Sequence, residues 1–228
     1  MNEVNKLTSI KEAMKHIKDG DRIMVGGFGL RGVPNELIDA LVECNKKNLV
    51  IISNDLGSPN VGLGRLLTNN LVKELIGNFY NWNPDVALAK NRGEIKASLI
   101  PQGSFAESIR AAGCGIPAYY TLASAGTELG KGKDVKVFEV NGQKREYVLE
   151  KALFADVALI NASVADTLGN LIYCKSARNF NPAMAMAAKY TIALVDRVVS
   201  PGELDPESIV TPHLFVNAVI KRGEKHED

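Results

Sequence analysis

The sequence predicts an α/β fold with an open, mostly parallel sheet, helices on both of its faces and a small antiparallel hairpin as an addition. Short apolar runs alternate with helical patterns along the 228 residues, which is typical of a parallel sheet with crossover helices. Residues 49–53 form a continuous run ending in a serine, as expected for a strand covered on both faces. Two strand-like runs flank Asn141-Gly142, a pair that supplies the positive φ angles of a tight hairpin turn.

The N-terminal half begins with a helix and continues as alternating strands and helices. Ser9 and Glu12 have the spacing of a capping box, so a helix is expected from there to Gly20. A strand over 22–25 then runs into glycines, and Pro34 suits the first turn of the next helix. The strand at 49–53 is followed by a helix over 64–69, a strand over 72–76 and a helix over 85–92.

The C-terminal half continues this alternation around the hairpin. Ser104 and Glu107 have the spacing of a second capping box, and Gly113 is expected to end that helix. The hairpin strands are expected over 136–140 and 144–149. The other expected elements are strands over 95–100, 118–122, 157–162, 191–195 and 215–220, a helix over 182–188 and a frayed charged tail over 221–228.

Composition limits the classes of function. Hydrophobic residues make up 46% and charged residues 23% of the chain, and the net charge is +1, so no basic field points to nucleic acid or to an anionic membrane surface. We expect one domain over residues 1–228, with a cytoplasmic location. Cys44, Cys114 and Cys174 lie far apart and show no metal-binding spacing, so no metal site is expected.

A glycine motif between the first strand and the second helix is the main candidate site. Gly27, Gly29 and Gly32 have the G-x-G-x-x-G spacing of dinucleotide sites, and Asp55 lies where a ribose-binding acid is expected. This pattern allows an NAD(P)- or FAD-dependent oxidoreductase. In such a site, however, the helix begins inside the motif, whereas Pro34 predicts a start after the third glycine. A tight strand-to-helix turn without any ligand is the other alternative.

The order Gly26-Gly27-Phe28, three residues, Gly32, one residue, Pro34 resembles the start of the A subunits of class I CoA-transferases. Segments similar to that family follow in the same order along essentially the whole chain. They are Ile52-Ser53-Asn54-Asp55, Pro101-Gln102-Gly103-Ser104-Phe105-Ala106-Glu107, Asp166-Thr167-Leu168-Gly169-Asn170, Ser176-Ala177-Arg178-Asn179-Phe180-Asn181-Pro182 and Ile209-Val210-Thr211-Pro212.

The resemblance implies an enzyme that moves coenzyme A between a short-chain acyl-CoA (acetoacetyl-, acetyl-, butyryl- or succinyl-CoA) and a small carboxylic acid. The implied mechanism is ping-pong, and its nucleophilic glutamate belongs to a separate B subunit in an A2B2 hetero-oligomer. Coenzyme A is then a substrate, and no cofactor is expected. An isomerase of similar fold acting on sugar phosphates without a B subunit, or a non-catalytic binding module, would also suit an α/β chain.

The resemblance also implies roles for individual residues. Gln102 would donate its side-chain amide to an oxyanion; without the resemblance, it would be a helix-entry residue bonded to nearby backbone. The coenzyme A and substrate contacts would come from Asn54 and from a loop whose backbone amides could face phosphate or pantetheine. The loop residues are Gly26, Gly27, Phe28, Gly29, Leu30, Arg31 and Gly32.

Two segments stand apart from this pattern. Glu128-Leu129-Gly130-Lys131-Gly132 partly matches the glutamate motif of the B subunits, but its last glycine comes one residue early, so Glu128 is expected to be a solvated loop acid. The segment 77–84 carries Phe79, Tyr80 and Trp82. The resemblance to the CoA-transferase A subunits implies a smaller and more polar stretch at this place. These aromatic residues predict either a contact between subunits or a reshaped acyl pocket.

Overall fold

The computed structural model describes residues 5–223, and its centre is a sheet of eight strands. Seven strands form a path in the order β11-β10-β8-β1-β2-β3-β4, and all neighbours along this path pair in parallel. The eighth strand, β9, pairs antiparallel with β8. The strands are β1 (Arg22–Val25), β2 (Leu49–Ile52), β3 (Val72–Gly77), β4 (Lys96–Leu99), β8 (Ala155–Asp166), β9 (Leu171–Ile172), β10 (Ala188–Val199) and β11 (Ala218–Lys221).

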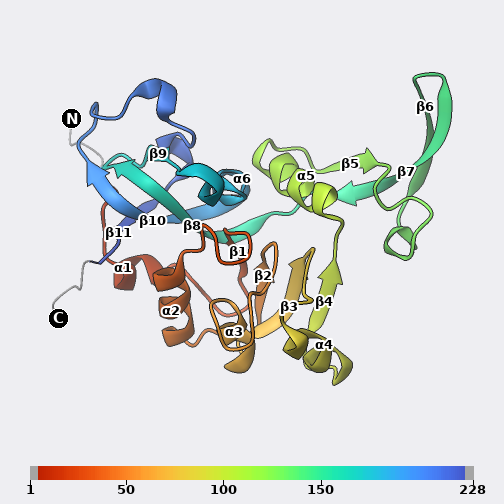
Figure 1. Cartoon of the computed structure of the whole chain (residues 1–228), viewed down its shortest axis with the longest axis horizontal. Helices are drawn as coiled ribbons and strands as arrows, with labels where there is room; N and C mark the ends of the chain where they lie inside the picture. Colours follow the sequence, from red (N-terminus) through yellow and green to blue (C-terminus); the bar gives the residue numbers. More distant parts are fainter. Residues whose placement is uncertain (1–4, 224–228) are drawn as a thin grey trace.

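Helices cover both faces of this sheet, which confirms the expected fold class (Figure 1). The helices α1 (Ile10–Met14), α2 (Asn35–Glu43), α3 (Gly64–Thr68) and α4 (Pro84–Asn91) contribute buried side chains to one core. The helices α5 (Gln102–Gly113) and α6 (Asn181–Ala187) contribute to the other. Successive residues of β1 alternate between the two cores: Ile23 and Val25 belong to the first, and Met24 to the second, as the two-residue period of a strand requires.

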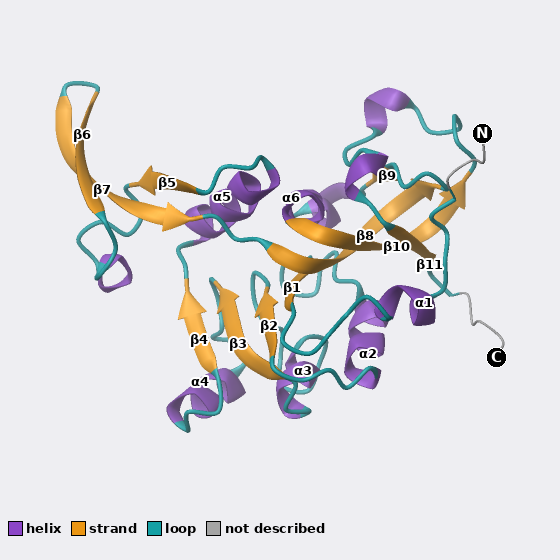
Figure 2. Ribbon diagram, turned by 180° about the vertical axis from the view of Figure 1, so that it is seen from behind, coloured by secondary structure: helices purple, strands orange, loops and turns teal. Residues whose placement is uncertain are grey.

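A separate three-stranded antiparallel sheet extends away from the main sheet, as both views show (Figures 1 and 2). Its strands are β5 (Ala118–Thr121), β6 (Val135–Val140) and β7 (Gln143–Lys151), in the order β5-β7-β6. Asn141 and Gly142 connect β6 to β7 with φ angles of 53° and 71°, so the expected hairpin is confirmed. The run at 118–122 is a strand, as expected, but it joins this small sheet.

Helix α5 begins two residues before the expected capping box. Its N-cap is Pro101, and the amide of Phe105 donates to the carbonyl of Pro101. The Ser104 side chain is buried and its hydroxyl has no partner among the described residues, so the Ser104–Glu107 capping box is wrong. Glu107 instead pairs with Arg110. Gly113 is the last helical residue, and the positive φ of 73° occurs two residues later at Gly115.

Other differences concern the limits of elements. The long strands β8 and β10 continue beyond the expected ranges because they pair with each other over their whole length. The strand expected over 215–220 is shorter at its start, because residues 213–215 form a 3-10 turn. In the expected tail, Lys221 belongs to β11, and residues 224–228 lie outside the described residues. No helix within residues 5–223 has the length and apolar character needed to cross a bilayer.

Candidate active site

The candidate site lies at the carboxyl ends of neighbouring parallel strands. The glycine loop (residues 26–32) follows β1, Asn54 and Asp55 follow β2, and Asn78 and Phe79 follow β3. The chain passes from β1 outward to β4 on one side and returns to place β8 on the other side of β1. Ligands of open α/β sheets bind at such a reversal of strand order, so the glycine loop occupies the favoured position.

Most backbone amides of the glycine loop are bonded within the chain. The amides of Gly26 and Gly29 donate to Leu159 O (3.0 Å) and Asp55 Oδ2 (2.8 Å), and Gly27 donates to Asn179 Oδ1 (3.1 Å). Phe28 and Arg31 exchange backbone bonds of 3.0 and 3.1 Å. These amides are therefore occupied, and the expectation that they could face phosphate is wrong for all five residues.

Two asparagines at the start of α6, Asn179 just before the helix and Asn181 as its first residue, hold the glycine loop in place. Asn181 is fully buried; its Oδ1 accepts from Asn161 N (2.9 Å), and its Nδ2 donates to Gly32 O (3.0 Å). Asn179 Nδ2 donates to Arg31 O (3.0 Å). Asn179 itself has φ 22° and ψ −120°, an uncommon conformation that its side-chain bonds stabilise. The sequence motif at 176–182 therefore acts on the loop after β1.

Asp55 supports the same loop and is not a ribose-binding acid. Its side chain is 6% exposed. Besides the Gly29 amide, it accepts from Gly57 N (2.9 Å) and Asn54 Nδ2 (2.8 Å). A carboxylate that already accepts three donors has a structural role, so the residue expected to bind ribose in the dinucleotide interpretation is already committed.

Two cavities adjoin the glycine loop besides a small space of about 20 Å³ that Gly26 and Gly27 line. The inner cavity, of about 300 Å³, is lined by Phe28, Asn54, Asn78, Phe79, Trp82 and Gln102. The outer cavity, of about 570 Å³, is lined by Phe28, Gly29, Leu30, Arg31, Gly57, Ser58 and Trp82. Phe28 and Trp82 line both. The structure thus brings Gln102, Asn54 and Phe28 together around the inner cavity, and it places Gly29, Leu30 and Arg31 at the outer one. Gly26, Gly27 and Gly32 line neither of these two cavities.

The aromatic segment after β3 divides between cavity and core. The rings of Phe79 and Trp82 meet edge to face with 5.1 Å between centroids, and Trp82 lies over Gly29, where an added Cβ would approach its ring to 3.1 Å. Tyr80 turns away and donates to Ser98 O (3.2 Å), and burial raises its pKa. Phe79 and Trp82 are therefore walls of the cavity, and Trp82 is 55% exposed, so the reshaped acyl pocket and the contact between subunits both stay predictions.

Gln102 is the exposed first residue of α5. Its side chain makes no hydrogen bond with any other described residue, so the alternative of a helix-entry residue bonded to backbone is not what the structure shows. A primary amide provides two N–H donors. The position of Gln102 beside the inner cavity leaves these donors free for a ligand.

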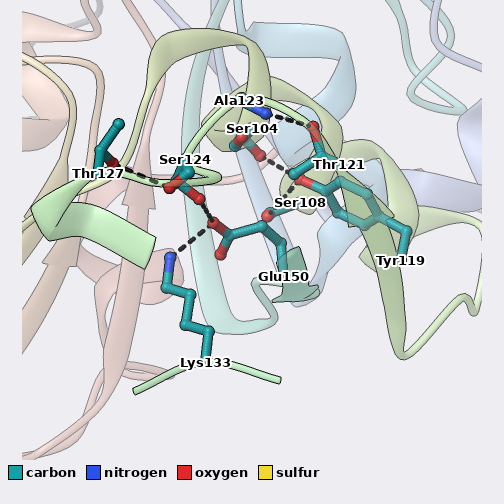
Figure 3. A network of polar contacts seen from close by, with 9 residues as sticks. All are labelled: Ser104, Ser108, Tyr119, Thr121, Ala123, Ser124, Thr127, Lys133 and Glu150. Atoms are coloured by element: carbon teal, nitrogen blue, oxygen red, sulfur yellow. Dashed lines mark hydrogen bonds and ion pairs between the residues drawn. The ribbon is translucent and has the colours of Figure 1, made fainter. Parts of the chain in front are cut away.

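The start of α5 is tied to the small sheet by a polar network (Figure 3). The hydroxyl of Tyr119 in β5 donates to Ser104 O (2.7 Å) and lies 3.1 Å from Ser108 Oγ. Burial raises the pKa of Tyr119. In the same network, the buried Glu150 accepts from Lys133 Nζ (2.6 Å) and Ser124 Oγ (3.0 Å). The small sheet therefore fixes the helix turn that carries Gln102.

Glu128 lies outside the site. Its side chain is 81% exposed and pairs with Lys131 at 2.5 Å, in the loop between β5 and β6. This confirms Glu128 as a solvated loop acid. Within residues 5–223, no group of three His, Cys, Asp or Glu side chains is arranged to hold a metal ion.

Some functional residues are apparent only in the structure. Asn78 lines the inner cavity, although only its aromatic neighbours stood out in the sequence. Asn179, Asn181 and Asp55 support the glycine loop from distant segments. The clustering of these asparagines in matched motifs was a usable signal, but spacing alone does not show which backbone groups they bind.

Comparison with known proteins identifies the family. The profile described as "Coenzyme A transferase" matches residues 7–222. The chain is 45% identical to the A subunit of the succinyl-CoA:3-ketoacid coenzyme A transferase of Helicobacter pylori strain J99, over 100% of this chain and 95% of that protein. It is 43% identical to the acetoacetyl-CoA:acetate/butyrate CoA transferase alpha subunit of Clostridium acetobutylicum, over 95% of this chain and 98% of that protein.

Solved structures agree on the fold. The acyl-CoA transferase YdiF of Escherichia coli O157:H7 superposes with a TM-score of 0.80 and 23% identity, over 97% of this chain and 47% of that one. Glutaconate coenzyme A-transferase of Acidaminococcus fermentans gives 0.80 and 22% identity, over 95% of this chain and 75% of that one. No comparison supports an oxidoreductase. From the family match and the full-length relatives, this chain belongs to the coenzyme A transferase family and is a CoA-transferase.

Proposed function

We propose that this chain is the A subunit of a two-subunit enzyme that moves coenzyme A between a short-chain acyl-CoA and a small carboxylic acid. The observation that carries this proposal is the position of Gln102, whose unbonded side-chain amide lines the inner cavity with Asn54 and Phe28. A neutral amide can stabilise an oxyanion without offering a competing proton. The names of the relatives support acetoacetyl-, acetyl-, butyryl- and succinyl-CoA as the range of donors.

The chemistry requires a carboxylate nucleophile, which we assign to the B subunit. Its attack on the thioester carbonyl forms an acyl-glutamyl anhydride and expels the thiolate of coenzyme A. The thiolate then attacks the glutamyl carbonyl, which gives a glutamyl thioester and releases the first acid as its carboxylate. The second acid reverses both steps. Gln102 would donate to the carbonyl oxygen that becomes negative at each addition.

The glycine loop supports the binding of coenzyme A in a different way from that expected. Its backbone amides are bonded within the chain and hold the loop in one conformation. Its side chains are the groups exposed to a ligand: Phe28 is 45% and Leu30 72% exposed. Arg31 brings a cation to the outer cavity. We propose that the outer cavity receives coenzyme A, with apolar contacts from Phe28 and Leu30 and charge from Arg31 toward its phosphates.

The partner is proposed on the same grounds. Among residues 5–223, no glutamate or aspartate lines the inner cavity, which supports a nucleophile supplied by another chain. The relatives are named as the A or alpha subunits of their enzymes, which supports a separate B subunit, and we propose an A2B2 assembly. We propose that the enzyme works without a bound cofactor or metal. A cytoplasmic location is also proposed, with support from the three free cysteines.

Reconstitution tests the proposal. The purified chain and its B subunit are mixed with acetoacetyl-CoA and acetate, and acetyl-CoA formation is followed by chromatography. We expect turnover from the mixture and none from either protein on its own. Borohydride should trap the thioester on a glutamate of the B subunit. Turnover by this chain alone at the rate of the mixture, or a thioester on one of its own side chains, would contradict the proposal.

A further inference from the structure

We propose that Arg222 is a positioning residue for CoA transfer, because its guanidinium holds the first turn of α2 against the sheet and thereby fixes the glycine loop. Arg222 directly follows β11 and lies far from the loop along the chain. The inference rests on the proposed use of the glycine loop by coenzyme A, but the contacts that carry it lie within this chain. Arg222 itself is assigned no contact with a substrate.

Arg222 is anchored to the central sheet by three hydrogen bonds. Its backbone amide donates to Val195 O (2.8 Å), which continues the pairing of β11 with β10. Its Nε donates to Asp196 Oδ1 in β10 (2.8 Å), and its Nη2 donates to Asn161 Oδ1 in β8 (2.7 Å). Because the guanidinium is planar and its donors have fixed directions, these bonds set its orientation at the carboxyl ends of β11 and its neighbours.

The remaining nitrogen of the guanidinium binds the first turn of α2. Arg222 Nη1 lies 2.5 and 2.6 Å from the two carboxylate oxygens of Glu36, and the two side chains are only 34% and 36% exposed. Hydrogen bonds between two charged groups are stronger than neutral ones. Pro34, the N-cap of α2, provides no side-chain cap. Apolar packing holds the face of α2 against the sheet, and the ion pair fixes its first turn.

The glycine loop is consequently held at both ends. Its start is tied to β8, because Asn181 packs against Gly26 and accepts from Asn161 N (2.9 Å). Its end leads into α2, where Glu36 lies in the first turn. Arg222 bonds Asn161 at the first end and Glu36 at the second. One side chain therefore fixes the separation between the two ends of the loop.

Trp82 reports the position of the loop. It is the only tryptophan of the chain. Its ring lies against Gly29, and 55% of the residue is exposed. A displacement of the loop uncovers the ring face that Gly29 covers, so quenching of the fluorescence by acrylamide rises. This measurement uses the purified full chain and does not depend on catalysis.

Two substitutions in the ion pair test the proposal, Arg222→Met and Glu36→Gln. In the purified chain, we expect both to raise the Stern–Volmer constant for quenching of Trp82. In the assembled two-subunit enzyme, we expect both to lower kcat/KM for acetoacetyl-CoA by about fivefold, mainly through a higher KM, because the displaced loop carries the proposed coenzyme A contacts.

Asp196→Asn is the matched control. Asp196 binds the same guanidinium, but it is exposed on β10 and lines neither cavity beside the loop. The control should leave Trp82 quenching and kcat/KM at their wild-type values. Arg222→Lys keeps a cation opposite Glu36 without the planar donors, so it should recover most of the kcat/KM that Arg222→Met loses. If Arg222→Met fails to fold, Glu36→Gln, which keeps the shape of the side chain, decides.

The outcomes separate positioning from stability. The proposal is overturned if Trp82 quenching or kcat/KM stays at the wild-type value in both ion-pair variants, even where their free energy of unfolding falls. It is also overturned if Asp196→Asn changes both quantities equally. If the wild-type assembled enzyme transfers no coenzyme A, the proposed function fails, and Trp82 quenching alone then decides whether Arg222 holds the loop.

Discussion

The side-chain oxygen of Asn181 occupies the space where a Cβ on Gly26 would lie, with only 1.8 Å between the two positions. Asn181 is fully buried and bonds to Asn161, Gly32 and Ala177. The first residue of the glycine loop must therefore be glycine because of packing. Its φ is not in the left-handed region, so the requirement does not come from backbone conformation.

Gly26→Ala should consequently destabilise the protein and disturb the loop. The methyl group forces Asn181 to move and break buried hydrogen bonds, so we expect the free energy of unfolding to fall by about 2–4 kcal/mol. Urea unfolding measures this change. Gly103→Ala is the control, because nothing lies within 4 Å of its added Cβ and alanine favours the helix. A Gly26→Ala protein as stable as wild type would show that Asn181 relaxes freely.

The sequence predicts the parallel strands and most helices because each has a local signal. The apolar residues of β1 and β2 and the Asn141-Gly142 turn are examples. It does not predict that β5 joins the small sheet, because the pattern of residues 118–121 is the same for either neighbour. It also misplaces the start of α5: Ser104 suits a cap by spacing, but Pro101 is the cap and Ser104 faces the core.

The candidate site is predictable in part for a similar reason. Gln102, Asn54 and Phe28 belong to matched motifs, and the structure brings them around one cavity. Asn179 and Asn181 belong to another matched motif, yet their bonds to a loop about 150 residues away depend on tertiary contacts. Asp55 also differs from its role in the dinucleotide interpretation. A carboxylate after β2 has the position of a ribose-binding acid, but here it accepts hydrogen bonds from the backbone amides of Gly29 and Gly57.

Gln102→Ala should abolish most activity without affecting stability. The side chain is exposed and unbonded, so its loss leaves the fold intact, whereas one oxyanion donor contributes about 10²–10³ in kcat. Steady-state kinetics of the assembled enzyme measures the effect, and unfolding curves verify the fold. Gln143→Ala, which removes an amide from the exposed end of the hairpin, is the control. If Gln102→Ala retains near wild-type kcat, its proposed role is wrong.

Tyr119→Phe tests whether the small sheet positions Gln102. The substitution removes the hydroxyl that bonds Ser104 and Ser108 in α5, so we expect a loss of about 1–2 kcal/mol in stability and a several-fold lower kcat. KM should change less than kcat, because the effect acts on the oxyanion donor. Tyr120→Phe is matched, since the Tyr120 hydroxyl bonds the solvent-exposed Asp134. A drop in stability with unchanged kcat would mean that Tyr119 is structural only.

Alkaline pH should destabilise the chain through two half-buried tyrosines, Tyr80 and Tyr173. Burial raises the pKa of Tyr80 and Tyr173 well above the usual value of about 10. Above pH 10, the unfolded chain loses phenolic protons that the folded chain keeps, so the unfolded state binds fewer protons. The free energy of unfolding then falls as pH rises, by about 1.4 kcal/mol per pH unit for each such tyrosine. Below pH 10 this contribution is fully present.

Phenylalanine substitutions isolate each contribution. Tyr173→Phe removes a group that titrates only in the unfolded state, so its stability should fall less steeply than that of wild type between about pH 10 and 11.5. The variant also loses the bond to Thr211 Oγ1 (2.8 Å), which lowers its stability at neutral pH and leaves the slope as the decisive quantity. Tyr147→Phe provides the control, because Tyr147 is a half-buried tyrosine of β7 in the small sheet, where its ring packs against Phe138. Equal slopes for Tyr173→Phe and wild type would show that the Tyr173 phenol ionises in the folded chain.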